Sequence, residues 1–115
     1  MNLALWIATG VLALIAFAGG VTKTFVPMEK LTRLRGAGWT RDARAGFVRT
    51  LGVLEVAAAV GFLVAPVLAA VTAGCWILLM VGAAVTHARR GEGWLAAVNV
   101  VYLALAAFVL AGRVA

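Results

Sequence analysis

The stretch RTLGVLEVAAAVGFLVAPVLAA, residues 49–70, decides the fold. It belongs to a run from residue 50 to residue 86 in which Glu55 is the only charged residue. Such a run is long enough to cross a bilayer twice, because one membrane helix needs about 20 apolar residues. Pro66 lacks an amide hydrogen and disfavours helix at the residue before it, so we expect two helices that meet there.

The rest of the chain has the same character. Of its 115 residues 65% are hydrophobic and only 12% are charged, whereas soluble domains carry roughly a quarter charged residues. Residues 1–22 and 93–112 form two further uncharged runs, and the first lacks the basic start of a signal peptide. We therefore predict an all-α polytopic membrane protein, a single domain over residues 1–115. Its four spans, at about residues 3–21, 48–65, 67–88 and 94–112, should form a compact antiparallel bundle.

The positive charges are distributed unequally between the two sides of the predicted bundle. The net charge is +6, and Arg113 is the only cation outside the first and third loops. The positive-inside rule then places the basic loop at about residues 23–47 in the cytoplasm, and both termini outside the cell (inner) membrane. Anionic lipid headgroups, not nucleic acid, are the expected partner of this loop. Nine cations lie in the two loops: Lys23, Lys30, Arg33, Arg35, Arg41, Arg44, Arg49, Arg89 and Arg90.

The basic loop contains a helix signal of its own, PMEKLTRLRGAGW at residues 27–39. Pro27 favours a helix start, Met28, Leu31 and Leu34 recur at helical spacing, and Gly36 favours a stop. The pattern predicts a short amphipathic helix that lies at the membrane interface between the first two spans.

Each predicted span brings a polar residue to the same half of the bundle. Counting about 1.5 Å per residue from the loops places these residues within about 12 Å of the cytoplasmic boundary. We interpret this set, together with the basic residue that begins the second span, as a candidate ligand-binding site. Its members are Lys23, Arg49, Glu55, His87, Asn99 and Tyr102.

Glu55 needs a partner at this depth. An unpaired carboxylate in hydrocarbon costs about 3 kcal/mol on insertion scales, so we expect Lys23 or His87 beside it. The small residues Gly20, Gly52 and Ala59 should let neighbouring helices pack closely around that pair. Read structurally, such a buried ion-pair network orders the helices and does nothing else. Read functionally, the same groups line a pocket for a lipophilic molecule.

The sequence lacks the usual signatures of redox and metal chemistry. With one cysteine, Cys75, the chain cannot form an internal disulfide, and a lone histidine predicts no metal site. No covalently bound cofactor is expected. If the protein is an enzyme, Glu55 and His87 are the candidate catalytic acid and base, because burial can tune both toward neutral pH.

Three motifs resemble the pattern of the DoxX-like family of small four-helix membrane proteins: FAGGVTK at residues 17–23, RTLGVLE at residues 49–55 and HARRGE at residues 87–92. The resemblance extends to the number of helices and to the basic first loop. It implies roles for Lys23, Arg49, Gly52, Glu55 and His87. The family takes its name from a subunit type associated with a thiosulfate:quinone oxidoreductase, so the resemblance makes quinone a candidate ligand and a membrane redox complex a candidate partner.

The amino-acid sequence leaves three functions from different classes open. The preferred one is a non-catalytic accessory subunit that binds a lipophilic ligand, such as quinone, or supports a redox or assembly complex. The second is a membrane-embedded enzyme in which Glu55 and His87 isomerise an apolar substrate or open an epoxide. The third is a small transporter formed by a homo-oligomer, which the lack of inverted repeats and broken helices disfavours.

Overall fold

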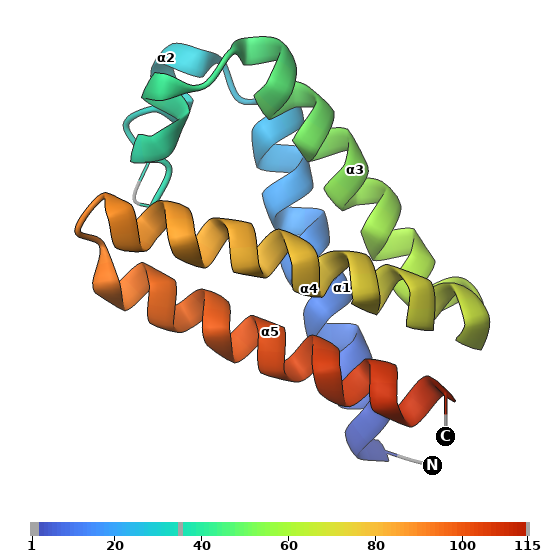
Figure 1. The fold of residues 1–115 in the computed structure, drawn as a ribbon. Coiled ribbons are helices and arrows are strands. Elements are labelled where there is room, and N and C mark those ends of the chain that lie inside the picture. Colours follow the sequence, from blue (N-terminus) through green and yellow to red (C-terminus); the bar gives the residue numbers. More distant parts are fainter. Residues whose placement is uncertain (1–2, 35, 115) are drawn as a thin grey trace.

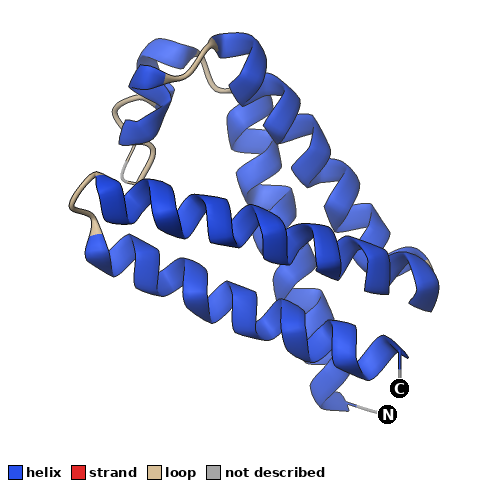
Figure 2. Ribbon diagram, viewed as in Figure 1, coloured by secondary structure: helices blue, strands red, loops and turns tan. Residues whose placement is uncertain are grey.

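Four long helices dominate the structure, a computed structural model that describes residues 3–34 and 36–114. They are α1 (Leu3–Phe25), α3 (Ala45–Val64), α4 (Pro66–Arg89) and α5 (Gly93–Val114), shown in Figure 1 and, by secondary structure, in Figure 2. Each is long and apolar enough to cross a membrane. The prediction of an all-α membrane protein with four spans is confirmed, and the predicted ends differ from the observed ends by a few residues.

The break at Pro66 occurs where the sequence predicts it. Helix α3 ends at Val64, and Ala65 is extended, with φ −154° and ψ 150°. Pro66 then begins α4, a position at which its missing N–H leaves no helical hydrogen bond unmade. One residue therefore separates two membrane helices, and the chain changes direction sharply at this point (Figure 1).

Helices α1 and α3 pack against each other through two glycines. A Cβ added at Gly20 would lie 2.7 Å from the carbonyl oxygen of Gly52, and one added at Gly52 would lie 2.6 Å from the Thr24 hydroxyl. Neither position has room for a side chain. Close approach of two backbones is the usual function of small residues between membrane helices. The predicted packing residue Ala59 is buried two turns further along α3.

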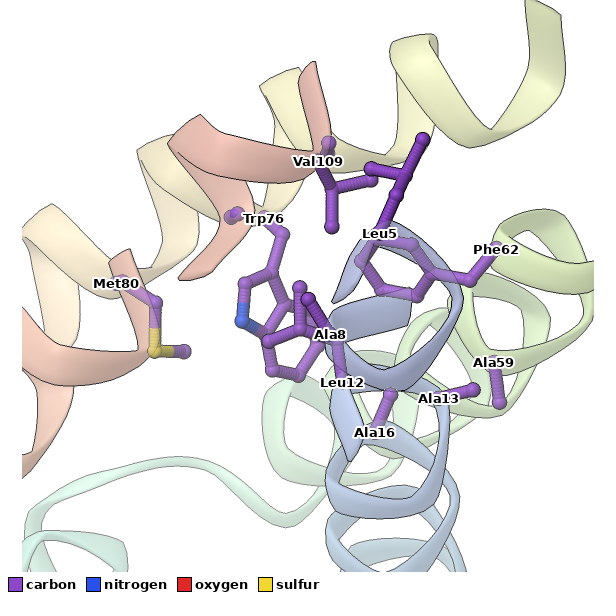
Figure 3. Close-up of a cluster of buried hydrophobic side chains, with 12 residues drawn as sticks. Leu5, Ala8, Leu12, Ala13, Ala16, Ala59, Phe62, Trp76, Met80 and Val109 are labelled. Atoms are coloured by element: carbon purple, nitrogen blue, oxygen red, sulfur yellow. The ribbon is translucent and has the colours of Figure 1, made fainter. Parts of the chain in front are cut away.

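The four helices form two pairs, and the pairs do not run alongside each other for their full length. Helix α1 packs mainly on α3 and α4 mainly on α5, and the second pair crosses the first (Figure 1). They meet near the chain termini, where the ring of Phe62 packs edge-on against Trp76 at 6.1 Å and Leu5 fills the space beside Gly112 (Figure 3). The molecule is thus less compact than the predicted bundle, because its core is concentrated at this end.

At the opposite end, the segment between α1 and α3 stands between the two pairs. It contains α2 (Met28–Leu31) and a 3-10 helix, η1 (Gly38–Asp42). Leu31 and Thr40 are fully buried and anchor it. Its far side contacts the other pair, since a Cβ added at Gly38 would lie 2.9 Å from the Arg90 guanidinium.

The helix predicted in this segment is present but short. Pro27 precedes it and Gly36, at φ +82°, lies beyond it, as the sequence suggests. Helix α2 nevertheless ends at Leu31, and the hydroxyl of Thr32 donates a hydrogen bond to the carbonyl oxygen of Glu29. Leu34, predicted to lie on its apolar face, is exposed beyond the helix. Its location at the membrane interface stays a prediction.

The packing of α1 on α3 can be tested with two alanine substitutions in the same helix. Gly20→Ala places a methyl group against backbone atoms of α3, whereas the Cβ position of Gly10 has no atom within 4 Å. We expect Gly20→Ala to lower the free energy of unfolding by about 1–3 kcal/mol, the usual cost of overpacking.

Gly10→Ala is the matched control, and it should be neutral or slightly stabilising, since alanine favours helix. Thermal unfolding of both variants in nanodiscs measures the difference. Equal melting temperatures for the two variants would show that the glycine contact does not limit the approach of the helices.

Candidate functional site

A cleft of about 460 Å³ lies between the two helix pairs, on the side where they separate. Helix α1 contributes Ile15, Gly19 and Lys23 and helix α3 contributes Phe47, Leu51 and Glu55, in both cases at intervals of four residues. A four-residue interval keeps side chains on one face of a helix, so each helix presents one continuous strip to the cleft. The remaining lining residues are Gly36, Trp39, Trp76, Leu78, Leu79, Met80, Gly82, Ala83, Thr86, His87, Asn99 and Tyr102.

The ammonium group of Lys23 pairs with the Glu55 carboxylate in this cleft. The Lys23 Nζ lies 3.1 Å from Oε1 and 3.0 Å from Oε2 of Glu55. The Glu55 side chain is only 7% exposed, so the nearby cation is what makes its burial tolerable. Gly19 provides the space for this contact, since a Cβ there would lie 2.7 Å from the Glu55 Oε1.

Arg49 stands outside the cleft, at the end of α1. Its Nη1 donates hydrogen bonds to the carbonyl oxygens of Lys23, at 2.7 Å, and of Val26, at 2.6 Å. The last carbonyls of a helix lack partners within the helix, and a cation there also matches the negative end of the helix dipole. Arg49 therefore caps α1 and holds the residue that pairs with Glu55.

His87 is paired with a residue that the sequence analysis did not select, Glu92. Helix α4 ends in a Schellman motif, in which Gly91 adopts φ +74° and donates its N–H to the Ala88 carbonyl. The amide of Glu92 donates to the His87 carbonyl at 2.8 Å. This turn brings the Glu92 Oε1 to 3.0 Å from the His87 Nδ1.

Arg90, which contacts Glu92, links the end of α4 to the segment between α1 and α3. The Arg90 Nε lies 3.3 Å from Glu92, and the Arg90 Nη1 donates to the Asp42 carboxylate at 2.8 Å. The hydrogen bond with His87, followed by the charges of His87 and Arg90, lowers the pKa of Glu92 below its ordinary value of 4.5. An ionic network thus adjoins the end of the cleft at His87, which we call the mouth.

Helix α5 contributes the two neutral polar residues. Asn99 and Tyr102 lie three residues apart on one face and both line the cleft. The Asn99 amide donates to the Leu95 carbonyl of its own helix, 2.9 Å away, which leaves its side-chain oxygen as an acceptor. The cleft wall therefore combines amide, hydroxyl, ammonium, carboxylate and imidazole groups with a largely apolar surface.

The structure brings together five of the six residues proposed from the sequence for ligand binding, and it places Arg49 elsewhere. Glu55 and His87 line the same cleft, but each bonds to another residue. Sequence reasoning missed Gly19, Glu92 and Trp76. A glycine four residues before Lys23 and a glutamate after a helix-ending glycine were available as signals for the first two. Trp76 lies within a long apolar run, and no sequence signal distinguished it from the other apolar residues there.

Comparison with known proteins agrees with this architecture. Residues 7–109 match the DoxX-like family, and the matched region includes almost all of the four helices and the cleft. The chain belongs to the DoxX-like family. Neither a curated protein nor a solved structure gives a significant match. The family membership inferred from the three sequence motifs is therefore confirmed.

The pairing of Lys23 with Glu55 in this DoxX-like protein can be tested by removing each partner in turn. Lys23→Met leaves a buried carboxylate without its cation, and we expect a loss of about 3 kcal/mol in the free energy of unfolding. Glu55→Gln should cost less, because Lys23 is 21% exposed and its long side chain can reach water.

The double variant carrying both substitutions should recover most of the stability lost in Lys23→Met. Chemical denaturation in detergent micelles gives the four free energies of this double-mutant cycle. Strictly additive losses would show that the two groups do not interact.

The contact of Glu92 with His87 predicts a pH dependence of stability. Because the pKa of Glu92 is lowered in the folded protein, its contribution is fully present above the unfolded value near 4.5. It is lost as the pH falls through the lower, folded value. We expect the difference in Tm between wild type and Glu92→Gln to be largest above about pH 4.5 and to shrink as the pH falls from there through the folded pKa.

Glu29→Gln, which alters an exposed carboxylate on α2, is the matched control for a general effect of charge. Melting curves of the three proteins across the acid range make the comparison. An acid-induced loss of stability that is unchanged in Glu92→Gln would contradict the assignment.

Proposed function

We propose that this DoxX-like protein is a non-catalytic accessory subunit that binds a lipophilic ligand in the cleft, with quinone as one candidate. The observation that carries the proposal is the cleft itself, whose 460 Å³ falls in the size range of small-molecule sites. Its wall is mostly apolar, with a few convergent polar groups, which is the usual composition of a ligand pocket.

The arrangement of polar groups supports binding more than chemistry. The carboxylate of Glu55 is held by Lys23 and the imidazole of His87 is held by Glu92. Each group is thus engaged by a neighbouring side chain, whereas a general acid or base must reach the substrate proton that it transfers. A neutral polar headgroup, by contrast, finds both donors and acceptors between Lys23, Asn99 and Tyr102.

A membrane location with defined orientation completes the proposal. The charge asymmetry supports an inner-membrane protein whose basic loop contacts anionic headgroups on the cytoplasmic side, with the termini outside. The mouth of the cleft would then lie toward the cytoplasmic half of the bilayer. In this proposal the partner is a redox or assembly complex, which the protein either supplies with the ligand or supports as a subunit.

Filling the cleft without disturbing the helix packing tests this proposal. Gly82 lines the cleft, and a Cβ added there meets no atom within 4 Å, so a larger side chain has room to enter. We expect saturable quenching of tryptophan fluorescence when decylubiquinone is titrated into nanodiscs containing the wild type. Gly82→Leu should weaken that binding about tenfold or more.

Gly74→Leu is the matched control, since Gly74 lies in the same helix, outside the cleft lining, and an added Cβ there also meets no atom within 4 Å. It should bind like the wild type. Quenching that does not saturate, or that is equal in all three proteins, would count against a quinone site in the cleft.

A further inference from the structure

Trp76 carries the least explained polar atom of the cleft. Its side chain is only 3% exposed, and its indole Nε1 has no hydrogen-bond partner in the part of the chain that the structure describes. Buried polar groups are hydrogen-bonded in the great majority of cases. If Trp76 served only to pack against Phe62, its buried N–H would cost free energy without benefit, because phenylalanine offers the same aromatic contact without a donor.

The indole nitrogen lies on the cleft side of the ring. Figure 3 shows the nitrogen-bearing edge directed away from Leu5 and Phe62, toward the side on which Met80 lies. Both Trp76 and Met80 line the cleft, and the side chains that surround the rest of the ring are apolar. The donor is therefore directed toward Met80, a residue that lines the cleft with Trp76.

The cleft is polar at both of its ends. Trp76, Met80, Ala83 and His87 recur at intervals of four, three and four residues and so share one face of α4. The 11 residues from Trp76 to His87 correspond to about 16 Å along the helix. On this face of α4, the apolar residues Met80 and Ala83 separate Trp76 from His87.

We propose that the Trp76 Nε1 is a binding subsite that donates a hydrogen bond to a carbonyl or hydroxyl oxygen on the inner end of the ligand. The inference rests on the proposed ligand-binding function and adds the class of ligand: an elongated lipid with oxygen at both ends, which extends along the part of α4 between Trp76 and His87, about 16 Å of helix. The ligand is neutral, because the charges of Lys23 and Glu55 already compensate each other and a charged headgroup would leave one of them unpaired.

Three probes of equal chain length separate the two polar ends: an n-alkane, the primary alcohol and the α,ω-diol. We expect the diol to bind the wild type in nanodiscs about three- to tenfold more tightly than the alcohol, which has one polar end. In protein labelled with ¹⁵N at the indole nitrogens, the diol should shift the Trp76 N–H resonance and slow its exchange with water. The alkane should do neither.

Trp76→Phe keeps the aromatic ring and removes the donor. In this variant the diol and the alcohol should bind with equal affinity, and the missing indole resonance assigns the Trp76 signal in the wild type. Trp94→Phe, outside the cleft lining, is the matched control and should keep the preference for the diol.

The outcomes distinguish the subsite from the function on which it rests. If the wild type binds neither these probes nor decylubiquinone, both the function and the subsite are overturned. If it binds the alcohol and the diol equally, or if Trp76→Phe folds and retains the preference, the subsite alone is overturned. If Trp76→Phe does not fold, the other three indole signals are assigned by their loss in Trp6→Phe, Trp39→Phe and Trp94→Phe, which leaves the fourth signal to Trp76. An N–H signal of Trp76 that the diol leaves unchanged in the wild type then overturns the subsite.

Discussion

The buried charge of Glu55 is the constraint on which the rest of the structure depends. A carboxylate within a membrane helix must be compensated, and the compensating cation comes from a different helix. That requirement brings the end of α1 against the beginning of α3. Gly19 leaves room for the carboxylate, Gly20 and Gly52 allow the backbones to approach, and Arg49 caps the carbonyls beside Lys23. Four residues that form no ion pair themselves thus make the pairing of Lys23 with Glu55 possible.

The close pairing of α1 with α3 has a consequence for the shape of the whole protein. The two tightly packed helix pairs are joined by one extended residue, Ala65, just before Pro66. They meet at one end through large aromatic and aliphatic side chains. At the other end the segment from Gly36 to Asp42 and its contacts with Arg90 keep the pairs apart. The cleft is the space that this geometry leaves, so its polar mouth and apolar interior follow from the depths of the residues on the four helices.

The charged groups and the imidazole of the cleft are engaged in contacts within the protein. The pairs formed by Lys23 with Glu55 and by His87 with Glu92 hold their side chains in place before any ligand arrives. Such preorganisation would reduce the ordering cost of the ligand binding that we propose. Trp76 is different, since its indole donor is buried without a partner in the described chain. A site with satisfied groups at its mouth and an unsatisfied donor at its inner end suits a long ligand better than a small polar one.

The sequence by itself determined the class, the number of spans, the break at Pro66 and the polar half of the molecule. These depend on local hydropathy and on one proline, which act over a few residues. It also limited the partner of Glu55 to Lys23 or His87, because few cationic side chains lie at that depth, and the structure decided for Lys23. Only the tertiary structure decided that the pairs splay apart, that Arg49 caps a helix and that Glu92 reaches His87. Only it revealed the unpartnered donor of Trp76. Helix crossing, the conformation of a terminal turn and the direction of a side chain depend on contacts between distant residues, and hydropathy carries no record of those contacts.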